Sequence, residues 1–389
     1  MKGFKFAGIY AGIKKKVQKD LGLIYCDTPC TAAALFTRNK VVAAPVILGK
    51  EKIKQGTCQA ILVNSGNANC FTGKKGIQDA QTCSKIVADI FKISDTQVMV
   101  SSTGVIGAPL PMDKFESGIA AVAQELAEDK LDDFADAILT TDTCRKVVTH
   151  TDKIDGQTFS ITGVAKGSGM IRPDMATMLA FICTDVKISS KKLKTALLKA
   201  NEKSFSRISV DGDTSTNDTI LALANGSSNA VIDTDAAADI FGKVLEEACL
   251  ELALKIVRDG EGATKVIQII VKGAQTKEDA YKACDAIAHS NLVKTAIYGE
   301  DPNWGRITAA AGRSGAQVDP EKIDLYIEGQ PLVLKGDWLG IDTEKKIARM
   351  MKNKQILIEL DLNLGEYSDY YFFCDFSEDY VKINADYRS

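Results

Sequence analysis

The strongest constraint on the fold is an alternation of short strand patterns with helix-period segments along the whole chain of 389 residues. The clearest example lies at residues 147–154 and 157–164, where apolar and polar side chains alternate on both sides of Asp155-Gly156. Asp-Gly favours the two-residue turn of a β-hairpin, so we predict a hairpin at this point. The mixture of strand and helix patterns predicts an α/β protein.

The same two periodicities predict the other elements. Strands are expected at 59–63, 99–101, 179–183, 265–271, 323–327, 355–360, 370–374 and 380–384. Helices are expected at 78–91, 113–127, 191–204, 235–257 and 277–289. There is no internal repeat and no Pro/Ser-rich linker, so the order of elements alone suggests a boundary. We place it near residue 280, between an N-terminal domain (1–280) and a C-terminal domain (281–389).

Composition restricts the class of partner. The formal net charge is -3, and Lys and Arg are spread along the chain without a basic stripe, which argues against a partner that is nucleic acid or an anionic membrane. The ten cysteines form no CxxC pair or His-Cys cluster, which argues against a zinc site and a disulfide framework. We therefore expect no metal, small-molecule partners, and a place in the reducing cytoplasm.

Histidine is scarce, which limits the available mechanisms. Only His150 and His289 occur, and neither lies in a Gly-rich context typical of a nucleophile site. Both are interpreted as surface or satisfied interior histidines. If the chain is an enzyme, its general base is expected elsewhere.

The most informative stretch is KGSGMIRPDMATMLAFICTD, residues 166–185. Gly167 and Gly169 permit backbone conformations closed to other residues, and Pro173 fixes its own φ. Thr177 therefore stands between a shaped Gly/Pro loop and a buried strand. Taken alone, an Ala-Thr pair here is most simply a threonine at the start of a strand. Its position also suits a threonine whose Oγ attacks the carbonyl of Ala176.

That attack would have a direct chemical consequence. The peptide nitrogen leaves, an ester forms, and water opens the ester to liberate the α-amino group of Thr177. An α-amine has a reference pKa of about 7.7 to 8.0, so it can deprotonate the hydroxyl of its own residue near neutral pH. An N-terminal threonine therefore needs no histidine.

KGSGMI-x-P-x-MATML resembles the nucleophile motif of the ornithine/glutamate N-acetyltransferases, in which the Ala-Thr bond is cut autocatalytically. Further segments resemble the family in the same order over nearly the whole chain. They are TRN (37–39), AAPV (43–46), NSGNAN (64–69), SSTGVIG (101–107), TTDT (140–143), SVDGDTSTND (209–218), DGEGATK (259–265), EDPNWGRI (300–307) and NADYRS (384–389).

Several of these segments also have a purely structural interpretation. NSGNAN and SSTGVIG are rich in turn residues and could be only turns. SVDGDTSTND lacks the glycine and closing glutamate of an EF-hand at their required spacing, so we interpret it as a structural or site-lining loop. EDPNWGRI is equally consistent with a packing corner and with a role in the site.

The resemblance implies roles for individual residues. Thr177 would be the nucleophile, and Thr103 and Gly104 would form the oxyanion hole that acyl transfer requires. The cleaved bond would join Ala176 to Thr177. The implied substrate-binding residues are Thr140, Lys166, Thr177, Glu261, Asn384 and Ser389.

The resemblance also implies an architecture and a reaction. Two β-sheets would lie between helix layers (αββα), followed by a smaller C-terminal α/β domain. An α chain (1–176) and a β chain starting at 177 would assemble at least as α2β2. The reaction would move acetyl from N2-acetyl-L-ornithine to L-glutamate through acetyl-Thr177, in arginine biosynthesis and without a cofactor. The sequence is equally consistent with acetyl-CoA as an additional donor.

Two rival functions are considered. The first is a self-cleaving aminopeptidase or amidase of the same architecture, which would release amines without needing an acceptor. The second is a non-catalytic binding protein for amino-acid metabolites, in which Thr177→Ala would leave ligand affinity intact.

Overall fold

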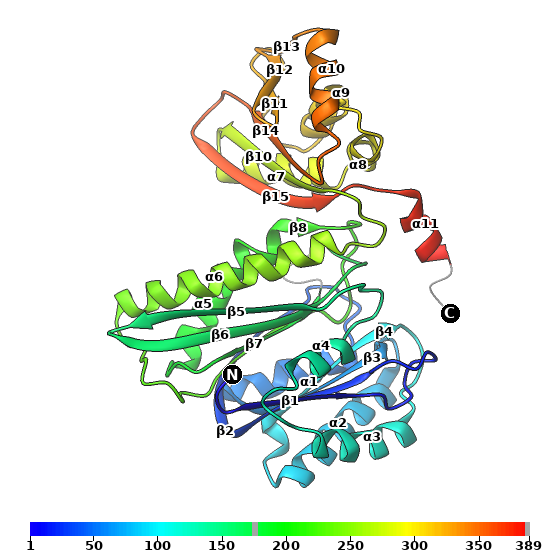
Figure 1. Cartoon of the computed structure of the whole chain (residues 1–389), viewed down its shortest axis with the longest axis vertical. Coiled ribbons are helices and arrows are strands. Elements are labelled where there is room, and N and C mark those ends of the chain that lie inside the picture. Colours follow the sequence, from blue (N-terminus) through cyan, green and yellow to red (C-terminus); the bar gives the residue numbers. More distant parts are fainter. Residues whose placement is uncertain (173–177, 386–389) are drawn as a thin grey trace. The chain divides into compact units, whose positions relative to one another are not determined.

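The structure is a computed structural model and describes residues 1–172 and 178–385. Contacts divide the chain into two compact units (Figure 1). Among the described residues, unit 1 contains 1–206 and 213–256, and unit 2 contains 207–212 and 257–385. The change at 257 comes earlier than the boundary placed near 280, because strand β10 (Val266–Ala274) pairs with β14 and β15 of unit 2.

Unit 1 is built on one hydrogen-bonded sheet of eight strands. Its order is β4-β3-β2-β9-β7-β6-β5, with β1 paired to β2. The strands are β1 (Phe4–Ile9), β2 (Leu21–Phe36), β3 (Thr57–Asn67), β4 (Val98–Val105), β5 (Lys146–Ile154), β6 (Gln157–Lys166), β7 (Leu179–Thr184) and β9 (Thr219–Ala224).

The long strand β2 divides this sheet into two layers. Its first part pairs with β1, its second part pairs with β9, and its pairing with β3 shifts register between Tyr25 and Cys30. One buried cluster joins side chains from both parts, including Phe6 and Ile24 on one side and Phe181 and Leu221 on the other. The two halves of the sheet therefore face each other across a shared core.

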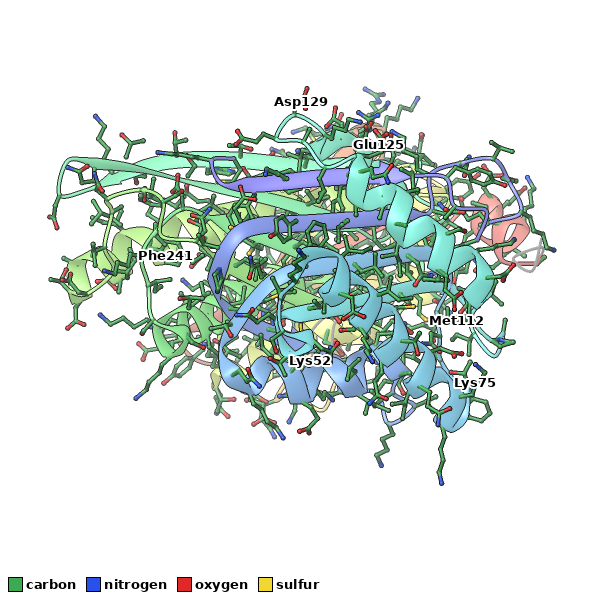
Figure 2. The ribbon with its side chains drawn as sticks, turned by 90° about the horizontal axis from the view of Figure 1, so that it is seen from below. Lys52, Lys75, Met112, Glu125, Asp129 and Phe241 are labelled. Atoms are coloured by element: carbon green, nitrogen blue, oxygen red, sulfur yellow. The ribbon has the colours of Figure 1, made fainter. Side chains whose placement is uncertain are left out.

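Helices cover the outer faces of both layers. Figure 2 shows α1 (Ala44–Lys52), α2 (Gly73–Phe91) and α3 (Met112–Gln124) over the outer face of the β1–β4 layer. The other layer is covered by α5 (Ser190–Glu202) and α6 (Asp235–Arg258). Apolar side chains on alternate strand positions thus reach a helix layer or the shared core. The αββα arrangement expected from the sequence is confirmed.

The hairpin predicted around Asp155-Gly156 is confirmed. β5 and β6 pair in antiparallel register down to Ile154 opposite Gln157. Asp155 and Gly156 have φ values of 50° and 79°, as a two-residue type I′ turn requires. This hairpin carries Lys166 to the end of β6.

Unit 2 contains a seven-stranded sheet in the order β13-β12-β11-β14-β10-β15-β8. Its remaining strands are β8 (Ile208–Ser209), β11 (Asp324–Ile327), β12 (Gln330–Leu334), β13 (Asp337–Trp338), β14 (Gln355–Asp361) and β15 (Tyr367–Cys374). Its helices are α7 (Lys277–Ala288), α8 (Asn291–Tyr298), α9 (Trp304–Gly312), α10 (Ile341–Met350) and α11 (Glu378–Ala385). A separate buried cluster forms the core of this unit.

The strand predicted at 380–384 is wrong, because these residues belong to helix α11. Glu378 and Asp379 lie in its first turn, where acidic side chains complement the helix dipole. Phe376 also packs on Tyr380, with ring centroids 4.4 Å apart. A short apolar/polar alternation could not reveal these helix-start signals. In the described ranges 1–172 and 178–385, no helix has the length and apolar character needed to cross a membrane.

Candidate active site

Thr103 and Gly104 lie at the end of β4, beside the end of β3. Ser65 pairs with Thr103 and Gly66 pairs with Gly104, so NSGN continues a strand and is not a loop. Gly104 has φ +130°, and a Cβ there would lie 2.4 Å from the carbonyl carbon of Gly66. Only glycine fits at this close approach. The close approach of β4 to Gly66 therefore explains why the segment SSTGVIG has a glycine at position 104.

Lys166 lies at the end of β6 and contacts Thr103. Its ammonium donates a hydrogen bond to Thr103 Oγ1 at 3.3 Å, and the lysine is 8% exposed. A hydroxyl whose oxygen accepts a hydrogen bond from an ammonium group is polarised and can still donate its own hydrogen. The Thr103 hydroxyl is therefore suited to bind an oxygen that becomes negative.

The carboxylate of Asp142, in the segment before β5, accepts hydrogen bonds from three other residues. Oδ1 accepts from Lys146 Nζ at 2.7 Å and from Gly167 N at 2.6 Å, while Oδ2 accepts from Thr140 N at 3.0 Å. Both Asp142 and Lys146 side chains are fully buried. Burial alone would raise the pKa of Asp142, but the charges of Lys166 and Lys146 and the donated hydrogen bonds hold that pKa well below its usual range. Asp142 thus joins Thr140 to the turn after Lys166.

Asp142→Asn is expected to destabilise unit 1 by about 3–5 kcal/mol at pH 7, because it leaves the buried Lys146 charge without its carboxylate. The folded-state pKa of Asp142 is depressed, so this stability is present above the unfolded-state pKa of about 3.9 and is lost as pH falls through the lower folded value. Chemical denaturation of wild type and variant from pH 7 downward measures the difference.

The exposed pair Lys5–Asp27 supplies a matched control, since its side chains are 38% and 59% exposed. Asp27→Asn should cost about 0–1 kcal/mol at most. Equal losses for the two variants, or a gap that persists at strongly acid pH, would contradict the role given to Asp142.

The loop 213–218 and the first residue of β9 contact the two flanks of residues 173–177. On one flank Ile171 forms a bridge with Thr214, whose hydroxyl donates to Arg172 O at 3.0 Å. On the other flank Thr219 N donates to Met178 O at 2.9 Å. The predicted cleavage residues Ala176 and Thr177 lie outside the described residues. The next residue is Met178, and β7 begins after it with Leu179, which pairs with Lys166.

Asp218 is a buried acid in the same loop, with 1% of its surface exposed. Burial raises its pKa well above the usual value, although the Ser215 hydroxyl, the Lys166 charge and the Thr37 hydroxyl act in the opposite direction. Its Oδ2 has no hydrogen-bond partner among the described residues. Asp218 is the last residue of SVDGDTSTND, a polar segment in which no local pattern indicates a buried acid.

Glu261 and Asn384 belong to unit 2 and contact each other. Asn384 Nδ2 donates to Glu261 Oε2 at 2.7 Å and to Tyr380 O at 3.0 Å. Glu261 is 7% exposed, and the following Gly262 has φ +70° against Ser377 and Tyr380. The structure therefore brings together two implied substrate-binding residues separated by more than a hundred positions. The third residue of this group, Ser389, lies outside the described residues.

Other candidate segments have structural partners. His150 Nε2 lies 3.0 Å from Glu251 Oε2, and His289 Nδ1 lies 2.7 Å from Asp285 O. In EDPNWGRI, Asn303 caps helix α9 and Trp304 packs on the unit 2 core. This segment forms a packing corner. Nine of the ten cysteines are buried.

Within unit 1 the structure brings together Thr103, Gly104, Thr140 and Lys166. Sequence reasoning missed Asp142, although the segment TTDT that contains it was noted. The missing signal was burial, because an aspartate in a turn is usually solvated. Its i,i+4 spacing from Lys146 was the only local sign of a partner.

The helix–sheet–sheet–helix layers of unit 1 are the architecture of the N-terminal-nucleophile class, and the donors at Thr103 and Gly104 suit acyl chemistry. A model of the ArgJ family matches residues 5–389. The chain belongs to the ArgJ family.

Relatives match along their whole length. The chain is 46% identical over 392 residues to the arginine biosynthesis bifunctional protein ArgJ of Geobacter sulfurreducens, covering 100% of both proteins. It is 47% identical over 389 residues to the protein of that name from Syntrophotalea carbinolica, covering 100% of this chain and 99% of the relative.

Two solved structures are also similar to parts of the chain. The crystal structure of arginine biosynthesis bifunctional protein ArgJ from Bacillus halodurans is 46% identical, with a TM-score of 0.42, over 45% of this chain and 92% of that chain. The ornithine acetyltransferase of Mycobacterium tuberculosis complexed with ornithine is 37% identical, with a TM-score of 0.40, over 44% and 92%.

Proposed function

We propose that this ArgJ-family chain is a self-cleaving acyltransferase that moves the acetyl group of N2-acetyl-L-ornithine to L-glutamate. The names of its full-length relatives support a role in arginine biosynthesis. The observation that carries the chemistry is the hydrogen bond from Lys166 Nζ to Thr103 Oγ1, beside Gly104 and next to the start of β7. This bond polarises the Thr103 hydroxyl, and Lys166 is itself paired with Leu179, two residues after Thr177.

Chain scission comes first in this proposal. Thr177 Oγ attacks the carbonyl carbon of Ala176, the C–N bond breaks, and the resulting ester is hydrolysed. The products are a carboxylate at Ala176 and an α-amine at Thr177. That amine then accepts the hydroxyl proton in each catalytic cycle.

Acetyl transfer follows in two half-reactions. Thr177 Oγ attacks the acetyl carbonyl, and the Thr103 hydroxyl and Gly104 N–H stabilise the oxyanion. The amide C–N bond breaks and ornithine leaves with the proton. The amine of glutamate then attacks the acetyl ester, N-acetylglutamate forms, and the hydroxyl is restored. No metal or organic cofactor takes part in either half-reaction.

The proposed substrate-binding residues offer charged and polar groups. Lys166 offers a cation for a substrate carboxylate, and Glu261 with Asn384 offers an anion and an amide for its polar groups. Thr140 and Ser389 complete the proposed binding set. The cleaved chains are proposed to form an α2β2 assembly in the cytoplasm, and acetyl-CoA is a further donor to be tested.

The decisive assay measures ornithine release from acetylornithine with and without glutamate. An acyltransferase should form N-acetylglutamate in step with the ornithine released. The rival aminopeptidase or amidase would release amine at the same rate without an acceptor. A binding protein would release none. Replacing acetylornithine by acetyl-CoA in the same assay tests the second donor.

A further inference from the structure

We infer that Lys14, on the loop between β1 and β2, is a positioning residue for the acetyl-transfer site. This inference rests on the proposed function. Asp20 is fully buried and accepts backbone N–H bonds from Ala11, Ile13 and Lys14 at 2.6, 2.6 and 2.9 Å. One carboxylate thus fixes the loop backbone at the point where the Lys14 side chain leaves it.

The stem of Lys14 packs on the strand that supports Gly104. A Cβ at Gly66 would lie 2.9 Å from Lys14 Cγ, so Gly66 has no room for a side chain beneath this lysine. Gly66 is also the register partner of Gly104 on β4, where a Cβ would lie 2.4 Å from the Gly66 carbonyl carbon. There is therefore no room for a side chain between the Lys14 stem and Gly66, or between Gly66 and Gly104. Any displacement of Lys14 is transmitted to the proposed oxyanion donor.

The head of Lys14 binds the segment before Thr140. Its ammonium donates to Leu139 O at 2.8 Å and to Lys19 O at 3.0 Å. Thr140 follows Leu139 directly and donates its N–H to Asp142, which in turn accepts from Gly167 beside Lys166. Lys14 therefore connects the oxyanion side of the site with its substrate-binding side.

These contacts close a ring around the site. Covalent neighbours and the contacts already described link, in order, Thr103, Lys166, Gly167, Asp142, Thr140, Leu139, Lys14, Gly66, Gly104 and again Thr103. The chain just before Thr140 has one further link to β3, because Ser65 Oγ donates to Ala137 O at 2.6 Å. Lys14 is the link that holds Leu139, the neighbour of Thr140, against Gly66, and it therefore helps to fix the spacing between the oxyanion donors and the substrate-binding residues.

The charge of Lys14 also interacts with Asp142 and Lys166. Burial lowers the pKa of Lys14, Asp20 and Asp142 oppose that change, and the like charge of Lys166 reinforces it. The ammonium group therefore adds positive potential where a carboxylate substrate or an oxyanion would sit.

Lys14→Met tests the inference, because methionine keeps the apolar stem and removes the ammonium group. We expect kcat/KM for acetyl transfer to fall about 10- to 100-fold, the scale of a misplacement near 1 Å. The loss should fall mainly on kcat, since misplaced donors weaken the transition state more than the bound substrate. Lys14→Arg, which keeps the charge, should recover part of the loss.

Lys52→Met is the matched control. Lys52 (Figure 2) is also a lysine of unit 1 whose pKa is lowered by burial, and its ammonium binds Asp95 O at 2.7 Å and Val98 O at 3.1 Å, away from the ring. Both variants remove an ammonium group that binds backbone carbonyls, so both should lose thermal stability, but Lys52→Met should keep the parental kcat.

Each outcome bears on one claim. Parental kcat in Lys14→Met, or an equal loss of kcat in Lys52→Met, would overturn the role of Lys14 alone. Absence of acetyl transfer in the wild-type protein would instead overturn the proposed function.

Discussion

Thr177→Ala should leave a single uncleaved chain and reduce acetyl transfer by about 10³- to 10⁶-fold, the range seen when a covalent nucleophile is removed. The same hydroxyl is required for scission and for transfer, so both activities should disappear together. Denaturing electrophoresis reports the first and the acetylornithine–glutamate assay reports the second. No other substitution considered is expected to have so large an effect.

Thr177→Ser is the matched variant, because it keeps the hydroxyl and removes only a methyl group. It should still cleave and retain part of the transfer activity. A cleaved, fully active alanine variant would exclude Thr177 as the nucleophile. A cleaved but inactive alanine variant would separate scission from transfer and assign the scission to another group.

Thr103→Val should lower kcat by about 10²- to 10³-fold, the usual cost of removing one oxyanion-hole donor. Valine has nearly the shape of threonine, and Thr103 is partly exposed, so the loss of stability should be small. The hydrogen bond of 3.3 Å from the Lys166 ammonium to Thr103 is lost in this variant, so the KM for glutamate should change as well. Steady-state kinetics on the purified, cleaved protein separates the two effects.

Thr184→Val provides the control for that experiment. Thr184 is a buried threonine at the far end of β7, and its hydroxyl donates to Ser160 O at 2.8 Å. Its replacement should cost stability and leave kcat unchanged. A fall in kcat of the same size in both variants would show that loss of a threonine hydroxyl from the sheet, and not loss of an oxyanion donor, explains the effect at Thr103.

Local sequence signals predicted much of the fold. The turn at Asp155-Gly156 and the helices starting near residues 113, 191 and 277 rest on short-range rules that hold wherever the segment lies. The strand predicted at 380–384 was wrong because local signals there do not distinguish a strand from a helix. Five residues with alternating polarity fit either a strand or one helical turn, and the contacts of Phe376 and Ser377 favour the helix.

The candidate site was predictable only in part. Gly104 and Lys166 stand in recognisable motifs, whereas Lys14 stands in a run of three lysines that has the composition of a solvated loop. Its role depends on Asp20 turning the loop back and on Gly66 leaving space for the stem. Such long-range contacts have no local sequence signature. The role of Asp142 was likewise not predictable from local sequence, because its partners include Gly167, 25 positions away.

The most direct test is the mass of the cleaved wild-type protein after brief incubation with acetylornithine alone. The account predicts two fragments, one ending at Ala176 and one beginning at Thr177. Only the second should gain a single acetyl group, borne by Thr177 and removed when glutamate is added. An intact chain, or an acetyl group on a residue other than Thr177, would contradict it.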